Sequence, residues 1–182
     1  RRLRQAGAII VGRTNMVEFA FSGLGLNPHY GTPKNPWDRA TGRIPGGSSS
    51  GAAVSVSDGM AAMGLATDTG GSVRIPAALC GLTGFKPTAR RISKDGTFPL
   101  STTLDSIGPI ATSVACCALV DSVLAGEAPQ TPSALPLTGL RLGVVQDYVL
   151  DGLDGAVAEA FGKALDRLSR AGASVTEVRF ES

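Results

Sequence analysis

The sequence is poor in the residues that build metal centres. Its 182 residues include one histidine, His29, and three cysteines, Cys80, Cys116 and Cys117, which do not have the spacing of a metal site. We expect neither a metal ion nor a cofactor. Adjacent cysteines rarely bridge one another, so we interpret all three as small buried hydrophobic residues of a protein from a reducing compartment, the cytoplasm.

Long apolar runs and an excess of one charge are also lacking. No run approaches the ~20 residues that a membrane helix needs, and the sequence does not open with a signal-peptide pattern. Seventeen lysines and arginines against 15 aspartates and glutamates give a net charge of +2. The basic cluster at residues 1–4 is typical of a solvated helix face. We therefore expect no membrane partner and no direct contact with nucleic acid.

Glycine and serine, by contrast, are concentrated in two loops, GGSSSG at 46–51 and TDTGGSVR at 67–74. Glycine carries no Cβ, so residues 69–72 can turn successive backbone N–H groups toward one point. Serine is a poor nucleophile at its free pKa. An enzyme that uses it must supply a proton acceptor and N–H groups for the developing oxyanion. The two loops have the composition of two halves of such a site.

Several motifs resemble the amidase signature family, the Ser-cisSer-Lys amide hydrolases. The dense matches are PGGSSSG at 45–51, TDTGGSVR at 67–74, PAALCG at 76–81 and GFKPT at 84–88. Looser matches are GRTNMVEFAFSG at 12–23 and NPWD at 35–38. The resemblance covers most of the first 125 residues. It implies an α/β fold, a layered α/β/α arrangement with a mixed β-sheet, of which this chain is a partial core.

The resemblance also implies roles for individual residues. Ser72 takes the position of the nucleophile. Ser48 takes that of the serine whose cis peptide bond, after Gly47, holds its hydroxyl between nucleophile and base. Asp68 and Arg74 flank the nucleophile closely enough to pair and support its loop. The implied oxyanion hole consists of the N–H groups of Thr69, Gly70, Gly71 and Ser72.

The family's catalytic lysine lies several tens of residues before the first glycine-serine loop, and here only 47 residues precede Ser48. We therefore expect the base upstream of Arg1, in a longer protein of which this chain is a segment that is inactive alone. A targeting segment could precede it as well. The lysines present are Lys34, Lys86, Lys94 and Lys163. None lies in the expected strand context, and Lys86, within GFKPT, is better interpreted as structural.

Other interpretations of these residues fit less well. Residues 47–51 fit the G-x-S-x-G nucleophile elbow with Ser49 as nucleophile, but that fold needs a histidine after the serine, and His29 comes before it. The loop at 67–74 could be a simple glycine turn or a phosphate nest, although it lacks the lysine of a P-loop. An aspartate such as Asp68 beside an arginine is usually a structural pair and not a general acid.

Hydrophobic periodicity predicts alternating strands and helices. Strands are expected at 8–11, buried on both faces, and at 61–66, 82–85, 140–145 and 174–180. Helices are expected at 16–21 with Asn15 as cap, and at 51–57, 73–79, 113–124 and 155–171. Residues 93–110 are interpreted as a loop, and the loop at 23–43 as anchored by Tyr30 and Trp37. One incomplete domain would then comprise a catalytic-loop core (1–126), a connector (127–138) and a βαβ unit (139–182).

These observations predict an amidase that cleaves a carboxylic amide to an acid plus ammonia or an amine, through an acyl-Ser72 intermediate. The alternative within the enzyme class is the glutaminase subunit of a tRNA-dependent amidotransferase. Such subunits resemble NMDEFAMGSS and GGSSGG, where this chain has NMVEFAFSG and GGSSSG, and the departures favour a stand-alone amidase. A catalytically silent scaffold fragment is the alternative from another class. Expected partners are a small amide substrate and either a second copy or amidotransferase subunits.

Overall fold

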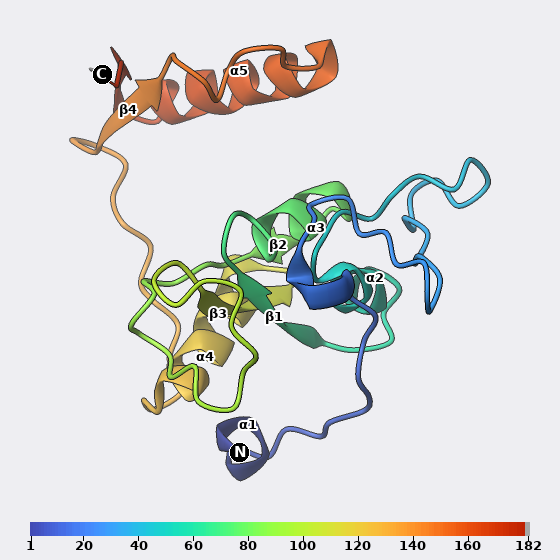
Figure 1. Cartoon of the computed structure of the whole chain (residues 1–182). Coiled ribbons are helices and arrows are strands. Elements are labelled where there is room, and N and C mark those ends of the chain that lie inside the picture. Colours follow the sequence, from blue (N-terminus) through green and yellow to red (C-terminus); the bar gives the residue numbers. More distant parts are fainter. Residues whose placement is uncertain (181–182) are drawn as a thin grey trace. The chain divides into compact units, whose positions relative to one another are not determined.

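The computed structural model describes residues 1–180, which form two compact units. The first comprises Arg1–Pro132 and the second begins at Ser133. Figure 1 shows the helices and strands of each unit. Both units combine helices and strands, which confirms the mixed α/β class expected from the sequence. Among residues 1–180, no helix combines the length and the apolar character needed to span a bilayer.

The first unit is built on a three-stranded antiparallel sheet of order β1-β3-β2. Its strands are β1 (Met63–Asp68), β2 (Thr83–Gly84) and β3 (Ser106–Ala111). Every residue of the central strand β3 is buried. The register pairs Asp68 with Ser106, so the end of β1 lies beside the start of β3.

Strand β3 corrects the prediction of a loop over 93–110. Its sequence, SIGPIA, has glycine and proline at its centre, and these usually indicate a turn. Here both are used for close packing. A Cβ on Gly108 would lie 2.1 Å from the carbonyl oxygen of Phe85, and the carbonyl of Pro109 accepts a hydrogen bond from the Phe85 N–H. The glycine is thus required by a neighbouring chain segment that periodicity does not reveal.

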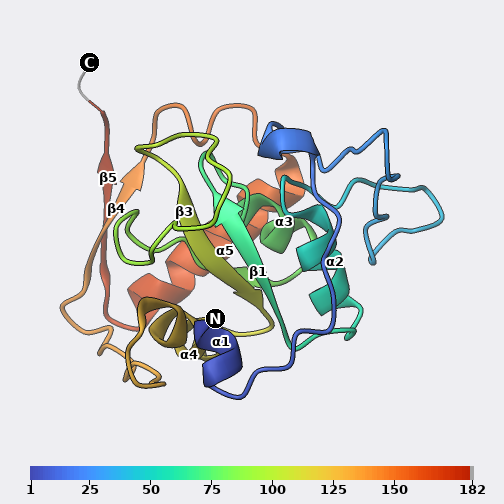
Figure 2. The ribbon, with the colours of Figure 1, turned by 60° about the horizontal axis from the view of Figure 1, so that its bottom comes forward.

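Four helices belong to the first unit: α1 (Arg2–Gln5), α2 (Ser50–Ser57), α3 (Arg74–Leu79) and α4 (Val114–Ala125). Helix α2 packs beside β1 and α4 beside β3 (Figure 2). Close approach of α2 depends on small residues, because a Cβ on Gly64 would lie 3.0 Å from the Cβ of Ala52. The main buried apolar cluster consists of Ala52, Ala53, Ala66, Val73, Ala77, Cys80 and Ile110.

The expected helix at 113–124 is confirmed as α4, and local interactions define both of its ends. The hydroxyl of Ser113 accepts the Cys116 N–H at 3.2 Å, which satisfies one of the unpaired donors of the first turn. At the other end, Gly126 adopts the left-handed conformation, with φ 86°. Local chemistry alone was therefore enough to define α4.

The N-terminal segment differs from the prediction. Residues 8–11 form no strand and Ile9 is 87% exposed, since no other described segment pairs with them. The helix expected at 16–21 is only a 3-10 turn, η1 (Glu18–Ala20). Asn15 does not cap it, because its side-chain amide donates to the carbonyl of Gly31 instead. Both predictions relied on local apolar patterns, but whether such a segment forms a strand or a helix depends on the segments that pack against it.

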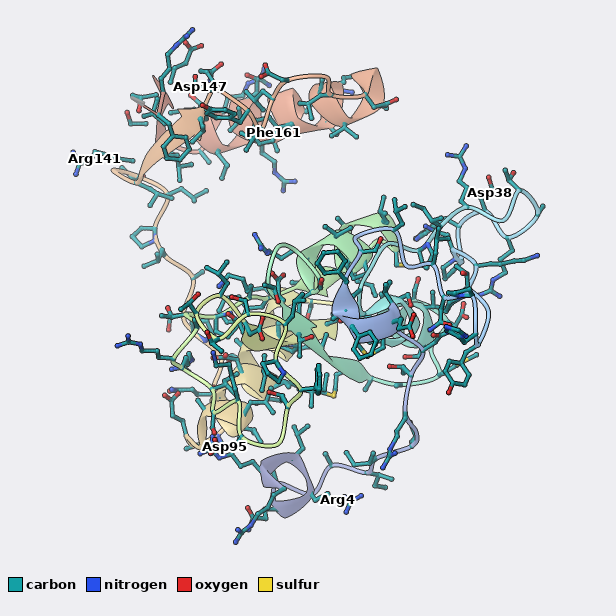
Figure 3. All side chains as sticks on the ribbon, viewed as in Figure 1. Arg4, Asp38, Asp95, Arg141, Asp147 and Phe161 are labelled. Carbon is teal, nitrogen blue, oxygen red and sulfur yellow. The ribbon has the colours of Figure 1, made fainter. Side chains whose placement is uncertain are left out.

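The long loop at 23–43 is anchored by Asn35 and Trp37. The indole N–H of Trp37 donates to the carbonyl of Cys80 at 2.9 Å, and the Asn35 amide donates to the carbonyl of Leu79, also at 2.9 Å. Tyr30, expected as a second anchor, is exposed. Asp38, labelled in Figure 3, forms an ion pair farther along the same loop.

The second unit contains β4 (Arg141–Val145), α5 (Gly155–Arg170) and β5 (Ser174–Val178). The two strands pair in parallel, which confirms the predicted βαβ unit. The Asp154 side chain caps α5 by accepting the N–H of Ala156 at 2.9 Å. None of the residues proposed for the site lies in this unit.

Candidate active site

The first glycine-serine loop leads into helix α2 and contains a cis peptide bond between Gly47 and Ser48, as the resemblance implied. Only glycine fits at position 47, because a Cβ there would lie 2.7 Å from the backbone nitrogen of Gly25. Ser48 is fully buried, and its carbonyl accepts the N–H of Val17 at 3.0 Å. The loop is therefore held from both sides by the segment at 17–25.

The Ser48 hydroxyl is buried, and no group among residues 1–180 forms a hydrogen bond with it. The expected hydrogen bond to Ser72 is thus not formed in this structure. A buried hydroxyl without a partner costs about 1–3 kcal/mol, so such a group requires an explanation. The two loops are nevertheless adjacent, because the N–H of Ser49 donates to the carbonyl of Ser72 at 3.4 Å.

The second loop is organised around Asp68, the last residue of β1. Its fully buried carboxylate accepts the N–H of Gly71 at 2.8 Å and that of Val73 at 3.1 Å, on either side of Ser72. The guanidinium of Arg74 donates to both carboxylate oxygens, from Nε at 3.0 Å and from Nη2 at 2.9 Å. The expected pair between Asp68 and Arg74 is therefore formed.

The charge state of Asp68 follows from these contacts. Burial by itself raises the pKa of this carboxyl, but the hydrogen bonds from Arg74 and from the backbone outweigh burial and hold the pKa below its ordinary value. The same contact raises the pKa of Arg74. Asp68 is thus an ionised structural group. A general acid would need a raised pKa.

Ser72 lies between two of the three amides that donate to Asp68, those of Gly71 and Val73, and the residue is 9% exposed. Gly71 already donates its N–H to Asp68, which leaves this donor less available to a ligand than the sequence suggested. Gly70 borders open space, since nothing lies within 4 Å of the point where its Cβ would be.

Asp105, which the sequence reasoning missed, supports the same loop from outside. Its carboxylate accepts a hydrogen bond from the Thr69 hydroxyl. It also accepts the N–H of Leu100 at 2.9 Å and the N–H of Ser101 at 3.0 Å. Burial by itself raises the pKa of Asp105. The hydrogen bonds from Thr69 and from these amides outweigh burial, so the pKa is lowered overall. The available signal was its place directly before the apolar run of β3. The interpretation of 93–110 as a loop concealed that signal.

Three of the four lysines have partners away from the glycine-serine loops, and one of these is Lys163, which pairs with Glu159. The ammonium of Lys86 donates to the carbonyl of Pro87 at 2.9 Å and to the hydroxyl of Ser106 at 3.3 Å, which agrees with a structural role. Lys94 donates to the carbonyl of Thr102. Because the Ser48 hydroxyl has no partner at all among residues 1–180, no lysine in the described part of the chain contacts it.

The side chains behind the rejected alternatives have other partners. The hydroxyl of Ser49 donates weakly to the carbonyl of Thr67, at 3.5 Å, and that of Ser50 to the carbonyl of Asn15, at 3.4 Å. His29 lies 3.5 Å from Glu18, and both side chains are exposed. Neither the elbow serine nor the histidine is therefore placed for nucleophilic catalysis.

A cavity of about 440 Å³ lies near β2 and α4 and contains no residue of the two loops. Asp121 lines it, with one carboxylate oxygen bound to Arg91 at 2.7 Å and the other buried with no hydrogen-bond partner in the described part of the chain. The remaining lining residues are Thr83, Gly84, Phe85, Val114, Cys117, Ala118, Ser122, Gln130 and Pro132. Because neither serine is among them, this cavity is separate from the candidate site.

The α/β scaffold that carries these loops is shared with solved amidase structures. The peptide amidase of Stenotrophomonas maltophilia is 35% identical and superimposes with a TM-score of 0.83, over 98% of this chain and 40% of that one. The protein belongs to the Amidase family, whose family model matches residues 1–182.

Two further relatives differ in function from each other. The 2-amino-5-chloromuconic acid deaminase of Comamonas testosteroni is 45% identical over 181 residues, 98% of this chain and 39% of that protein. A glutamyl-tRNA(Gln) amidotransferase subunit of Thermotoga maritima is 34% identical with a TM-score of 0.88, over 98% of this chain and 42% of that one. The chain therefore spans about two fifths of the length of its relatives.

Proposed function

We propose that the protein is an amide hydrolase that uses Ser72 as its nucleophile and passes through an acyl-serine intermediate. The observation that carries this proposal is the buried hydroxyl of Ser48, which has no hydrogen-bond partner among residues 1–180 and lies on the loop adjacent to that of Ser72. A buried donor and acceptor with no structural partner is expected where protons are relayed. Its missing partner would be the general base, a lysine that none of the described contacts supplies.

In the proposed reaction, the base takes a proton from Ser48 as Ser48 takes one from Ser72. The Ser72 oxygen then attacks the amide carbonyl, and the tetrahedral oxyanion is stabilised by backbone N–H groups of residues 69–72. Among these, Gly71 would contribute least, because its N–H already donates to Asp68. The C–N bond breaks as the leaving nitrogen receives the proton. Water then hydrolyses the acyl ester and restores Ser72.

Asp68 and Arg74 would act as supports in this scheme. The ion pair and the amide hydrogen bonds of Asp68 set the direction of the N–H groups around Ser72. Fixed donors need no reorganisation when charge develops on the substrate oxygen, which is the main source of oxyanion-hole catalysis. Neither residue would exchange a proton with substrate.

A second candidate function is the glutaminase reaction of an amidotransferase, in which the released ammonia passes to partner subunits. The 34% identity to the amidotransferase chain from Thermotoga maritima supports it. A homodimer is the corresponding proposal for a stand-alone amidase.

We also propose a cytoplasmic location, because Cys80, Cys116 and Cys117 are all free thiols. Burial raises the pKa of the Cys80 thiol to about 11, so it would remain protonated there.

The test is to replace Ser72 with alanine in the full-length protein and to measure turnover of simple primary amides and of glutamine. Ser72→Ala should lower kcat by about 10³-fold or more while the fold is retained. Ser49→Ala is the matched control, and it should keep most of the activity. If Ser72→Ala retains more than a few per cent of turnover, the assignment is wrong. Turnover only of glutamine, and only with added partner subunits, would favour the amidotransferase.

A further inference from the structure

The side chain of Asn35, in the NPWD motif at 35–38, bridges two chain segments of the candidate site. The residue is buried, with 6% of its surface exposed. Its amide nitrogen donates to the carbonyl of Ile44 at 3.2 Å and to that of Leu79 at 2.9 Å. Its amide oxygen accepts the N–H of Trp37 at 3.0 Å. Both polar atoms of this side chain therefore have partners, and both donor bonds go to backbone carbonyls.

The two carbonyls belong to the two halves of the proposed site. Ile44 directly precedes the loop that contains Ser48. Leu79 is the last residue of α3, the helix that follows Ser72. The Asn35 amide therefore joins the start of one serine loop to the far end of the helix that leads away from the other.

The Ser48 loop packs directly on α3 beside this bridge. A Cβ on Gly46 would lie 2.9 Å from the side chain of Leu79, so only a glycine permits this approach without a shift of the helix. The thiol of the fully buried Cys80 donates to the carbonyl of Pro45 at 3.4 Å. These contacts hold the first residues of the loop against the end of α3.

Direct contacts between the two serine loops are weaker. The N–H of Ser49 donates to the carbonyl of Ser72 at 3.4 Å, and the Ser49 hydroxyl donates to the carbonyl of Thr67 at 3.5 Å, both long for hydrogen bonds. Such contacts fix the separation of the Ser48 and Ser72 hydroxyls only loosely. The shorter bonds of the Asn35 amide fix it more firmly, because a hydrogen bond is stronger in a buried, low-dielectric setting.

We propose that Asn35 is a positioning residue, which keeps the Ser48 loop in register with Ser72 so that a proton can pass between the two hydroxyls. This inference rests on the proposed amide hydrolysis and adds a residue to it. Proton transfer needs the two oxygens within about 3 Å, and a misplacement of ~1 Å can lower a rate about 100-fold. Asn35 acts on this distance through the carbonyls of Ile44 and Leu79.

The test compares propionamide with p-nitrophenyl propionate in the full-length protein, since both deliver the same acyl group to Ser72. The leaving nitrogen of the amide must receive a proton, whereas nitrophenolate leaves without one. Asn35→Ala should therefore lower kcat/KM for the amide about 10-fold to 100-fold, and the amide-to-ester ratio of kcat/KM should fall at least about fivefold. A smaller folded fraction would lower both rates equally and leave their ratio unchanged.

Two further variants separate positioning from stability. Asn35→Asp keeps the size of the side chain and the acceptor for the Trp37 N–H but loses the amide donors, so it should not restore the ratio. Leu124→Ala opens a cavity in the separate apolar cluster of Ile92, Ile107 and Leu124. This control should lower thermal stability and leave the amide-to-ester ratio as in wild type.

Hydrogen exchange measured by mass spectrometry tests the bridge without turnover. In Asn35→Ala the backbone N–H groups of residues 46–51 should exchange about tenfold faster, while those of α5 in the second unit should not change. A wild-type ratio in Asn35→Ala, or its full recovery in Asn35→Asp, would overturn the positioning role, and unchanged exchange at 46–51 would overturn the bridge itself. If the wild type hydrolyses neither compound, the proposed function fails, and hydrogen exchange alone then decides whether Asn35 holds the loop.

Discussion

The carboxylate of Asp68 is clamped by Arg74 on one side and by backbone amides on the other, with Ser72 between two of those amides. Asp68 is fully buried, whereas half of the Arg74 side chain is exposed. The two members of the pair therefore differ in how much the fold depends on them. Removing the buried charge leaves the amides around Ser72 without their acceptor. Removing the exposed charge leaves three amide hydrogen bonds to Asp68.

We predict that Asp68→Asn destabilises the first unit more than Arg74→Ala does. An asparagine cannot accept all of the amide and guanidinium hydrogen bonds that Asp68 accepts, and each buried donor left without an acceptor costs about 1–3 kcal/mol. When Arg74 is removed, Asp68 keeps its three amide donors, so this loss should be smaller, about 1 kcal/mol. Urea denaturation followed by the fluorescence of Trp37, the sole tryptophan, measures both variants. Arg43→Ala, which breaks an exposed pair with Asp38, is the control and should have little effect. Equal losses for the first two variants would contradict the unequal roles.

The same contact predicts an acid dependence of stability. The folded-state pKa of Asp68 is lowered, so its contribution is fully present above the unfolded-state pKa of about 4. It is lost as the pH falls through the lower folded-state pKa. The difference in unfolding free energy between wild type and Asp68→Asn should thus be constant above about pH 5 and shrink below about pH 4. A difference that stays constant down to about pH 2 would show that Asp68 does not titrate in this way.

Asp105 should position the oxyanion loop through Thr69. We predict that Asp105→Ala lowers kcat by about 10-fold to 100-fold with a smaller change in KM, because small misplacements of catalytic groups are costly. Asp105→Asn should restore part of the rate, because the asparagine side-chain oxygen can still accept a hydrogen bond from the Thr69 hydroxyl. Thr69→Val tests the same contact from the other side. Steady-state kinetics that show no rescue by asparagine would point to a loss of folding and not of positioning.

Gly108 and Gly162 should respond to alanine with opposite signs. A Cβ at Gly108 in β3 would collide with the Phe85 carbonyl, so Gly108→Ala should destabilise the first unit by about 2 kcal/mol or more. Gly162 lies within α5 and has open space around it. Gly162→Ala should stabilise the second unit by about 0.5–1 kcal/mol. Thermal unfolding monitored by circular dichroism would reveal the two shifts, and a neutral Gly108→Ala would contradict the close packing of β3.

Features that depend on neighbouring residues could be derived from the sequence. The helix at 113–124 was predicted from its apolar pattern, and Ser113 and Gly126 set the ends of α4 through local hydrogen bonds and a left-handed turn. The βαβ unit followed from two apolar runs around an amphipathic helix. The loop of Asp68 and Arg74 was likewise identified from residues only six positions apart. For α4 and for the Asp68 loop the decisive interactions lie within a few residues of chain, whereas the βαβ unit was predicted from a local pattern in each element although its two strands are distant in sequence.

What only the tertiary structure decided depends on residues distant in sequence. Strand β3 was missed because Gly108 and Pro109 look like turn residues until Phe85 lies against them. Asp105 supports the Ser72 loop only because the fold brings the Thr69 hydroxyl within hydrogen-bond distance of it. The Phe19 ring likewise contacts the ring of Phe98, which is distant in sequence. Residues 8–11 show the converse, since an apolar run forms a strand only where another strand supplies hydrogen bonds. Local patterns specify what a segment can become, whereas long-range packing and hydrogen bonding determine which of those states is adopted.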